Sequence, residues 1–111
     1  MAVVSRLLGK LRPANTTAAS VYNKPAGARV KIESIVIANL DTSSHAFRLF
    51  WDYGTTYDQT TALFYDVIIA SNTTLQMDSL GWAFDGGTGN LAFRTDSGNN
   101  LICWAWGEEA N

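Results

Sequence analysis

Residues 28–52 read ARVKIESIVIANLDTSSHAFRLFWD, two alternating segments joined by a polar turn. The first segment alternates apolar and charged residues as far as Glu33 and then becomes apolar on both sides. In the second, the aromatic residues fall mainly on one of the two alternating faces. A period of two residues is typical of strands whose alternate side chains face a core. We therefore expect strands at residues 28–40 and 45–52, with a turn at residues 41–44.

The rest of the chain repeats this pattern, because Gly, Asn, Asp and Ser clusters separate short apolar runs. We expect further strands at residues 63–69, 73–77, 91–95 and 101–106. The first two of these should pair around a short turn, the last two should form a hairpin, and the glycine-rich residues 85–90 should be a loop. After residue 13 no segment has helical periodicity, so a parallel α/β fold lacks its crossover helices. The sequence predicts an all-β, antiparallel sandwich.

Length and composition indicate one domain with a single core. The chain has 111 residues, of which 47% are hydrophobic and 16% charged. One cysteine excludes an intrachain disulfide and a cysteine-rich zinc site. Arg6 and Lys10 interrupt the apolar start, unlike an export signal, and no apolar run approaches the roughly 18 residues that cross a bilayer. We expect a soluble chain with no membrane partner.

Charge divides the chain into two unequal parts. Residues 1–32 hold six basic and no acidic residues, whereas residues 33–111 hold two basic and ten acidic residues, so +6 and −8 give the net charge of −2. A segment of one sign can attract a partner, or another copy, of the opposite sign. We expect a basic N-terminal arm and linker at residues 1–19 and a sandwich body at residues 20–111.

The arm combines apolar and basic residues, and its conformation as helix, strand or extended chain stays open. We predict apolar anchoring by Val3, Val4, Leu7, Leu8 and Leu11. Electrostatic steering toward an acidic shell or neighbouring subunit would come from Arg6, Lys10 and Arg12. The simpler alternative is that the arm lies across its own acidic body. If the arm serves a neighbour, deleting residues 1–14 should leave a folded domain that no longer assembles.

The sequence contains no recognisable set of catalytic residues. His45 is the single histidine, so a zinc site would need carboxylates for its remaining ligands. Cys103 lies in an apolar strand without nearby basic residues, which indicates a buried small hydrophobic residue. Nucleophile-elbow, phosphate-loop and zinc-helix motifs are missing. We therefore expect neither an enzyme nor a cofactor.

Two binding alternatives remain. Oxygen ligands for calcium could converge from Asp52, Asp58, Asp85, Thr88 and Asn90, although such residues more often form ordinary turns. A carbohydrate-binding platform could use Trp51, Tyr53 and Tyr57, but Trp51 shares the inward parity of its strand and is expected in the core. Specific nucleic-acid binding is disfavoured, because apolar residues interleave the basic ones and the body would repel phosphate.

Several short motifs resemble those of small virion proteins of tailed phages. They are a Leu-Gly start at residues 8–9, a Pro-Ala-Asn-Thr-Thr linker at 13–17, a Tyr-x-x-Pro-Ala-Gly turn at 22–27 and the strand at 30–39. Later similarities are Phe47-Arg48, Tyr65-Asp66-Val67 and the closing Trp106-Gly107-Glu108. The resemblance implies a β-sandwich, often a jelly roll, that decorates or cements a capsid or sits in the neck or tail, commonly as a trimer. It brings no catalytic residues.

These observations predict a non-enzymatic structural protein of a phage particle, with a jelly-roll-like body and an extended arm. Its partners would be further copies of itself, forming a trimer, and the major capsid protein or another virion protein. A neck, tail or fibre component is the alternative within the same class. A carbohydrate-binding sandwich is the alternative from another class.

Overall fold

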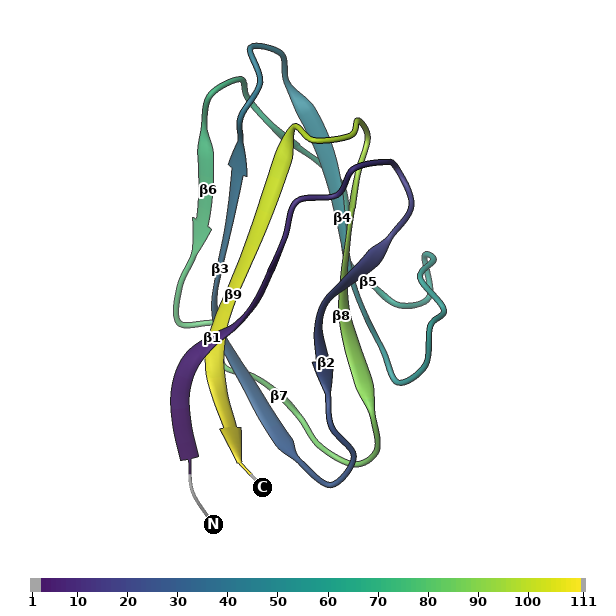
Figure 1. Cartoon of the computed structure of the whole chain (residues 1–111), viewed down its shortest axis with the longest axis vertical. Coiled ribbons are helices and arrows are strands. Elements are labelled where there is room, and N and C mark those ends of the chain that lie inside the picture. The colour runs from purple at the N-terminus through teal and green to yellow at the C-terminus, as the bar shows by residue number, and fades with distance from the viewer. Residues whose placement is uncertain (1–2, 111) are drawn as a thin grey trace.

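The computed structural model describes residues 3–110, and this part of the chain forms nine strands and no helix (Figure 1). It therefore contains no apolar helix that could cross a membrane. The strands are β1 (Val3–Leu11), β2 (Ala19–Lys24), β3 (Arg29–Asn39), β4 (His45–Asp52), β5 (Ala62–Ile69), β6 (Thr74–Met77), β7 (Trp82–Phe84), β8 (Gly89–Thr95) and β9 (Leu101–Ala110). The expected strands are present, within a few residues at their ends.

The strands form two antiparallel sheets that face each other. One sheet has the order β1-β9-β3-β6, with β7 also paired to β3, and the other has the order β2-β8-β4-β5. If β6 and β7 are counted as one interrupted strand, because both pair with β3, this order is that of an eight-stranded jelly roll. The predicted all-β antiparallel sandwich is confirmed.

Two predicted strand pairings are wrong. β5 pairs with β4 and β6 pairs with β3, so the turn between β5 and β6 carries the chain from one sheet to the other. In the same way β8 pairs with β2 and β4, whereas β9 pairs with β1 and β3. The alternation of apolar and polar residues indicates which face of a strand is buried, but it does not indicate which strand lies beside it. A short turn therefore does not distinguish a hairpin from a crossing between sheets.

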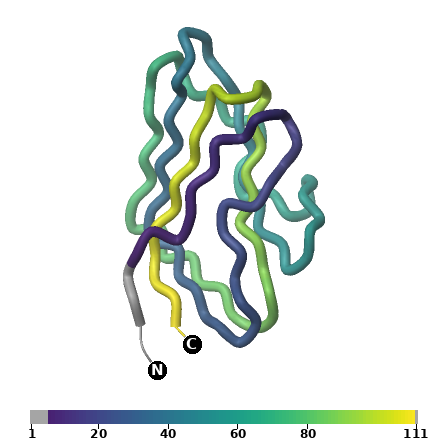
Figure 2. The backbone as a smooth tube through the Cα atoms, viewed as in Figure 1, coloured from purple at the N-terminus to yellow at the C-terminus, as the bar shows by residue number. Residues whose placement is uncertain are grey.

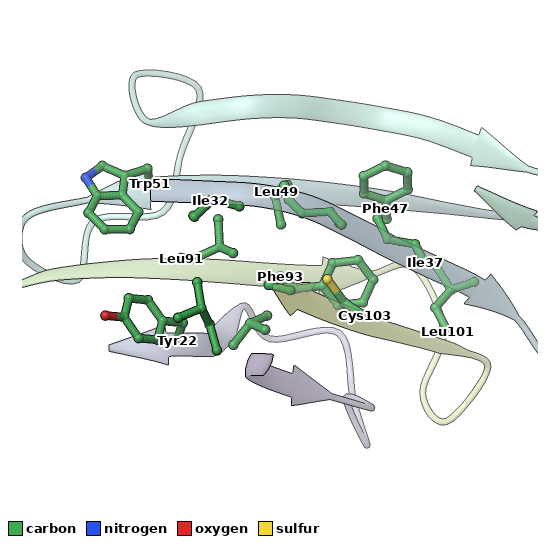
Figure 3. Packing of buried hydrophobic residues seen from close by; sticks show 14 of the residues in the cluster. Tyr22, Ile32, Ile37, Phe47, Leu49, Trp51, Leu91, Phe93, Leu101 and Cys103 are labelled. Atoms are coloured by element: carbon green, nitrogen blue, oxygen red, sulfur yellow. The ribbon is translucent and has the colours of Figure 1, made fainter. Parts of the chain in front are cut away.

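The core lies between the sheets and is lined by the inward residues of both (Figure 3). Ile32, Ile37, Leu49, Leu91 and Phe93 are fully or almost fully shielded from solvent. At one end of this core Trp51 stacks on Phe84, with ring centroids 3.8 Å apart. The ring of Trp51 also explains Gly89, because a Cβ at that position would come within 2.5 Å of the indole. β8 begins at Gly89, so the last residues of the expected glycine-rich loop belong to a strand.

The expected arm is a strand of the sandwich. β1 pairs along its length with β9, more than ninety positions away in sequence, and a bulge between Leu7 and Gly9 turns Leu8 into the core. A Cβ at Gly9 would lie 2.0 Å from the carbonyl oxygen of Val21, so the close passage of β1 over β2 requires glycine. The alternative in which this segment lies across its own body is the arrangement found. Whether residues 20–111 fold by themselves remains a prediction.

The connections gather at the two ends of the sandwich (Figure 2). Those between β1 and β2, β3 and β4, β5 and β6, and β8 and β9 lie at one end, which we call the His45 end. The β2–β3 turn and the β7–β8 loop lie at the opposite end, which we call the Lys24 end. The loop at residues 53–61, which joins β4 to β5, projects from the side of the molecule.

Candidate interaction surfaces

The predicted anchoring residues of β1 separate into buried and exposed groups. Leu8 is 9% exposed and belongs to the core, and Leu11 packs against the same core. Leu7 remains 39% exposed. β1 includes Val3 and Val4, but their side chains lie outside the described part of the structure. Leu8 and Leu11 are therefore used within the chain itself, and Leu7 is the described apolar residue of β1 that faces solvent.

The basic residues of β1 and of the turn after it lie on the surface. Arg6 pairs with Glu109 of β9. The Nζ of Lys10 lies 4.9 Å from the centroid of the Trp104 ring, which is a cation–π contact. Arg12 donates two hydrogen bonds, of 2.9 and 2.7 Å, to the carbonyl oxygen of Asn99. Among residues 3–110, neither Lys10 nor Arg12 has a carboxylate within ion-pair distance.

Lys24 does not contribute to the basic surface that the sequence suggested. It is 2% exposed, and its ammonium group donates to three backbone carbonyl oxygens, those of Ala28 (2.6 Å), Pro25 (3.0 Å) and Gly86 (3.1 Å). Three acceptors match the three donors of a lysine ammonium group. Lys24 thus joins the β2–β3 turn to the β7–β8 loop, which is a structural role that charge counting missed.

The outer face of the β1-β9-β3-β6 sheet carries large apolar side chains. Burial alternates along β9, so that Leu101, Cys103 and Ala105 face the core and the residues between them face outward. The two outward tryptophans are nearly parallel, with ring centroids 6.0 Å apart. We call this surface the Trp104 face and define it by Leu7, Lys10, Val36, Ile102, Trp104 and Trp106.

Sequence reasoning missed the Trp104 face, although a signal for it was present. Trp104 and Trp106 have the same parity in a strand whose opposite parity holds Cys103 and Ala105. Two adjacent tryptophans opposite small residues are consistent with an apolar outer face. Tryptophan is enriched at protein interfaces, where it contributes much of the binding energy.

The outer face of the other sheet is covered in part by the chain itself. Phe50 points away from the core cluster but is only 1% exposed, and Ala92 beside it is completely shielded. The loop at residues 53–61 supplies the cover, because the ring centroid of Tyr57 lies 5.9 Å from that of Phe50. Burial raises the pKa of the Tyr57 phenol, so its hydroxyl stays protonated at neutral pH. The loop at residues 53–61 therefore protects Phe50, whereas Leu63, Tyr65 and Ile68 of β5 in the same sheet remain exposed.

The three rings of the suggested carbohydrate platform do not share a surface. Trp51 is 8% exposed and lies in the core, as its parity predicted. Tyr53 contacts the edge of Trp51 and is 57% exposed, whereas Tyr57 packs on Phe50. Only Tyr53 of the three presents most of its ring to solvent. Sugar binding by this region remains an untested prediction.

Two of the three carboxylates suggested for calcium, Asp52 and Asp58, accept local hydrogen bonds. Asp52 accepts from the backbone amides of Gly54 and Thr56, both at 2.9 Å, and Asp58 accepts from Thr60. These are the contacts of ordinary turns. Within residues 3–110, no group of three or more His, Cys, Asp or Glu residues is arranged to hold a metal ion. Cys103 is buried, and its burial raises the pKa of the thiol, so it is present as an unreactive thiol at neutral pH.

His45 lies between two carboxylates at the end named after it. Its Nε2 is 2.7 Å from Asp41 and its Nδ1 is 2.8 Å from Asp96. The hydrogen bond to Asp41, supported by the one to Asp96, raises the pKa of the imidazole. A doubly protonated ring can donate to both carboxylates at once, whereas a neutral ring donates to one. The cluster therefore joins the β3–β4 and β8–β9 connections most firmly when His45 is charged.

Comparison with known proteins supports the fold and gives no family assignment. No protein-family model matches the sequence, and no curated protein matches it. In fold, the chain is similar to the Drosophila NLP core, described for pentamer formation and histone binding, with a TM-score of 0.51, 9% identity and complete coverage of both chains. It is also similar to the capsid of the Helicobacter pylori bacteriophage KHP30, with a TM-score of 0.52, 9% identity and coverage of 100% of this chain and 94% of that one.

A third similar structure is that of the infectious bursal disease virus Gx strain, with a TM-score of 0.53 and 11% identity. The match covers 97% of this chain but 32% of the viral chain, so this chain corresponds to about a third of that protein. At such identities the likeness concerns the fold. The fold of the chain is a jelly-roll sandwich, a fold that also occurs in viral capsid proteins.

Proposed function

We propose that this chain is a non-enzymatic structural protein of a phage particle, a decoration or cement protein that self-associates and binds the shell of the major capsid protein. The phage virion proteins that its motifs resemble commonly form trimers, and we propose the same for this chain. Binding to the shell would use the Trp104 face and the basic residues of β1. A neck or tail location is the alternative within this class.

The observation that carries the proposal is the Trp104 face. An antiparallel sheet that meets water normally presents polar residues on its outer side, yet Ile102, Trp104 and Trp106 occupy that side of β9. Trp104 and Trp106 are half-buried and stack on each other, and Leu7 beside them is 39% exposed. Contiguous apolar surface on a small soluble domain is typical of a binding site. Fold likeness to viral capsid proteins supports the virion setting but does not by itself assign a function.

Co-expression with the major capsid protein from the same genome tests the proposal. Purified shells should contain the chain at a copy number approaching that of the shell protein, as expected of a cement protein. A few copies per particle would instead support a neck or tail location. Shells that contain none of the correctly folded chain would contradict binding to the shell.

Surface variants are a sharper test than deletion of residues 1–14, because deletion removes β1 and takes Leu8 out of the core. The double variant Trp104→Ser/Trp106→Ser should remain folded and fall at least about tenfold in occupancy on shells. The matched control is Tyr53→Ser/Leu40→Ser, which removes two large side chains that are more exposed (57% and 49%) and lie off the Trp104 face. Equal loss in both variants would contradict the proposed surface.

A further inference from the structure

β5 carries half of the exposed large apolar side chains among residues 3–110. Six such side chains are exposed, and three of them, Leu63, Tyr65 and Ile68, lie on this one strand of eight residues. Phe64 and Val67 of the same strand pack against the core, so β5 buries one set of apolar side chains and exposes another. Ile68 is 71% exposed, the highest value of the six. We call Leu63, Tyr65 and Ile68 the β5 surface.

The β5 surface is electrically neutral. Residues 59–77 contain one charged residue, Asp66. Arg48 of β4 donates two hydrogen bonds to that carboxylate, of 2.6 and 3.1 Å. The same guanidinium group lies 3.8 Å from the centroid of the Tyr65 ring, so Arg48 is engaged by both neighbours. The one charge of the strand is therefore paired within the chain.

A hollow of about 160 Å³ adjoins Ile68. It is lined by residues of β5, of β6 and of the turn between them, among them Ile69, Thr73 and Leu75, and none of its lining residues is charged. The surface thus places an exposed apolar side chain beside an uncharged depression.

The backbone of β5 is poorly suited to extending the sheet, although β5 is an edge strand. It stands last in the order β2-β8-β4-β5. Its register against β4 shifts twice, and Asp66 has a φ of +53°. Such irregularities interrupt a continuous ladder along a free edge. A partner would therefore meet the side chains of β5 and not its backbone.

We propose that copies of this chain associate through the β5 surface, with Ile68 next to the symmetry axis of the oligomer. At a rotation axis each group meets the same group of another copy, so charged groups repel there and apolar groups can pack. Ile68 of one copy would meet Ile68 of the others, and the hollow would take up part of the contact. Lys10 and Arg12 could not occupy such a place without like-charge repulsion.

The inference rests on the self-association part of the proposed function and assigns a surface to it. The β5 surface and the Trp104 face belong to different sheets. An oligomer built on β5 would therefore leave the Trp104 face uncovered for the shell. Each apolar surface would then have a partner of its own.

Engineered disulfides test the position of the axis, because Cys103, the single native cysteine, is buried. A disulfide needs Cα atoms within about 7 Å of each other, so mild oxidation should join copies of Ile68→Cys efficiently only if Ile68 lies near its counterpart. We expect such joining at concentrations where the wild type self-associates. In a trimer two of every three chains can be joined, whereas in a two-fold dimer all can. Either pattern supports the β5 contact, and the second would contradict the proposed trimer.

Tyr53→Cys is the matched control, because Tyr53 is 57% exposed and lies on the loop at residues 53–61, outside β5. Its disulfide should form at least about tenfold more slowly than that of Ile68→Cys, since no contact holds the two thiols together. Equal rates in the two variants would overturn the placement of Ile68 at the axis.

Analytical ultracentrifugation of Ile68→Asp gives an independent measurement. This variant brings like charges together at the axis, so it should associate at least about tenfold more weakly than the wild type. Tyr53→Asp adds the same charge outside β5 and should associate as the wild type does. Trp104→Ser/Trp106→Ser should also self-associate normally, although it binds shells weakly. Thermal melts should show that all variants are folded.

The outcomes separate this inference from the proposed function. A wild type that is monomeric at every concentration would overturn self-association as a whole. A self-associating wild type whose Ile68→Asp variant associates equally well would overturn the β5 contact and leave self-association standing. Weaker self-association of Trp104→Ser/Trp106→Ser, with Ile68→Asp unaffected, would assign the contact between copies to the Trp104 face instead.

Discussion

The two ends of the sandwich are fastened by different chemistry. At the Lys24 end, one buried ammonium group donates to three neutral carbonyl oxygens of two connections. At the His45 end, the buried amide of Asn39 donates to Ser43, Ile69 and Ala70, and His45 adds contacts to two carboxylates nearer the surface. The Lys24 end is held by hydrogen bonds to backbone carbonyl oxygens, which do not titrate, whereas the His45 end includes an imidazole with a raised pKa. The comparison teaches that only the His45 end should respond to mild changes in pH.

The largest effect should come from Lys24→Met, which keeps the length of the side chain and removes its donors. Three buried carbonyl oxygens would lose their partner, so we expect the free energy of unfolding to fall by about 3 kcal/mol. The loss should be the same from about pH 5 to about pH 9, because the acceptors do not titrate. Urea denaturation measures it. The exposed Lys31→Met, which removes a surface pair with Glu33, should cost less than about 0.5 kcal/mol.

The second-largest loss of stability should come from substituting Asn39. Asn39→Leu removes the donors to the β3–β4 and β5–β6 connections, and we expect a loss of about 2 kcal/mol in the same measurement. Asn39→Asp is the informative companion, because it keeps an oxygen for the amide of Asp41 but directs a carboxylate at carbonyl oxygens. Relative to the wild type, Asn39→Asp should therefore lose more stability near neutral pH than near pH 4, whereas the loss in Asn39→Leu should be the same at both pH values. Equal behaviour of the two variants would contradict the donor role.

The sequence predicted the strands better than it predicted these fastenings. β3, β4 and β9 were found because alternation over eight or more residues is a strong signal. β7 was missed because three residues are too few to show a period, and β2 was read partly as linker because polar residues precede it. Burial of Lys24 has no clear sequence signal, since one of its three acceptors is the carbonyl oxygen of Gly86, 62 positions away.

The candidate surfaces were predicted in part. Outward basic residues on the N-terminal segment were expected from charge, and Arg6, Lys10 and Arg12 lie on the surface. Alternation puts Leu7 and Leu8 on opposite faces but does not say which face is buried, and the bulge between Leu7 and Gly9 then interrupts the alternation. A one-residue shift in a strand exchanges its faces, so the exposed residue was not identifiable without the partner strand.

A smaller effect is expected from His45, and its sign depends on pH. The pKa of folded His45 is raised, mainly by Asp41, so the contribution to stability is complete below the ordinary imidazole value of about 6.5 and is lost as the pH rises through the folded value. The wild type should melt about 2 °C above His45→Gln near pH 5.5, and this advantage should disappear by about pH 8.5. Calorimetry at several pH values measures the difference. A constant difference across this range would show that the charge of His45 does not fasten the loops.

The smallest effect distinguishes the two carboxylates beside His45. The hydrogen bond to Asp41 is the main cause of the raised pKa of His45, and the hydrogen bond in turn lowers the pKa of Asp41. Asp41→Asn should therefore lower the pKa of His45 more than Asp96→Asn does, with changes in melting temperature too small to rank the two. An NMR titration of the imidazole resonances gives the order directly.

Asp96 also accepts a hydrogen bond of 2.8 Å from the amide of Ala46, so Asp96→Asn should instead perturb the first residues of β4. If Asp96→Asn gave the larger fall in pKa, the β8–β9 connection would be the main partner of His45, and protonation would chiefly hold that loop.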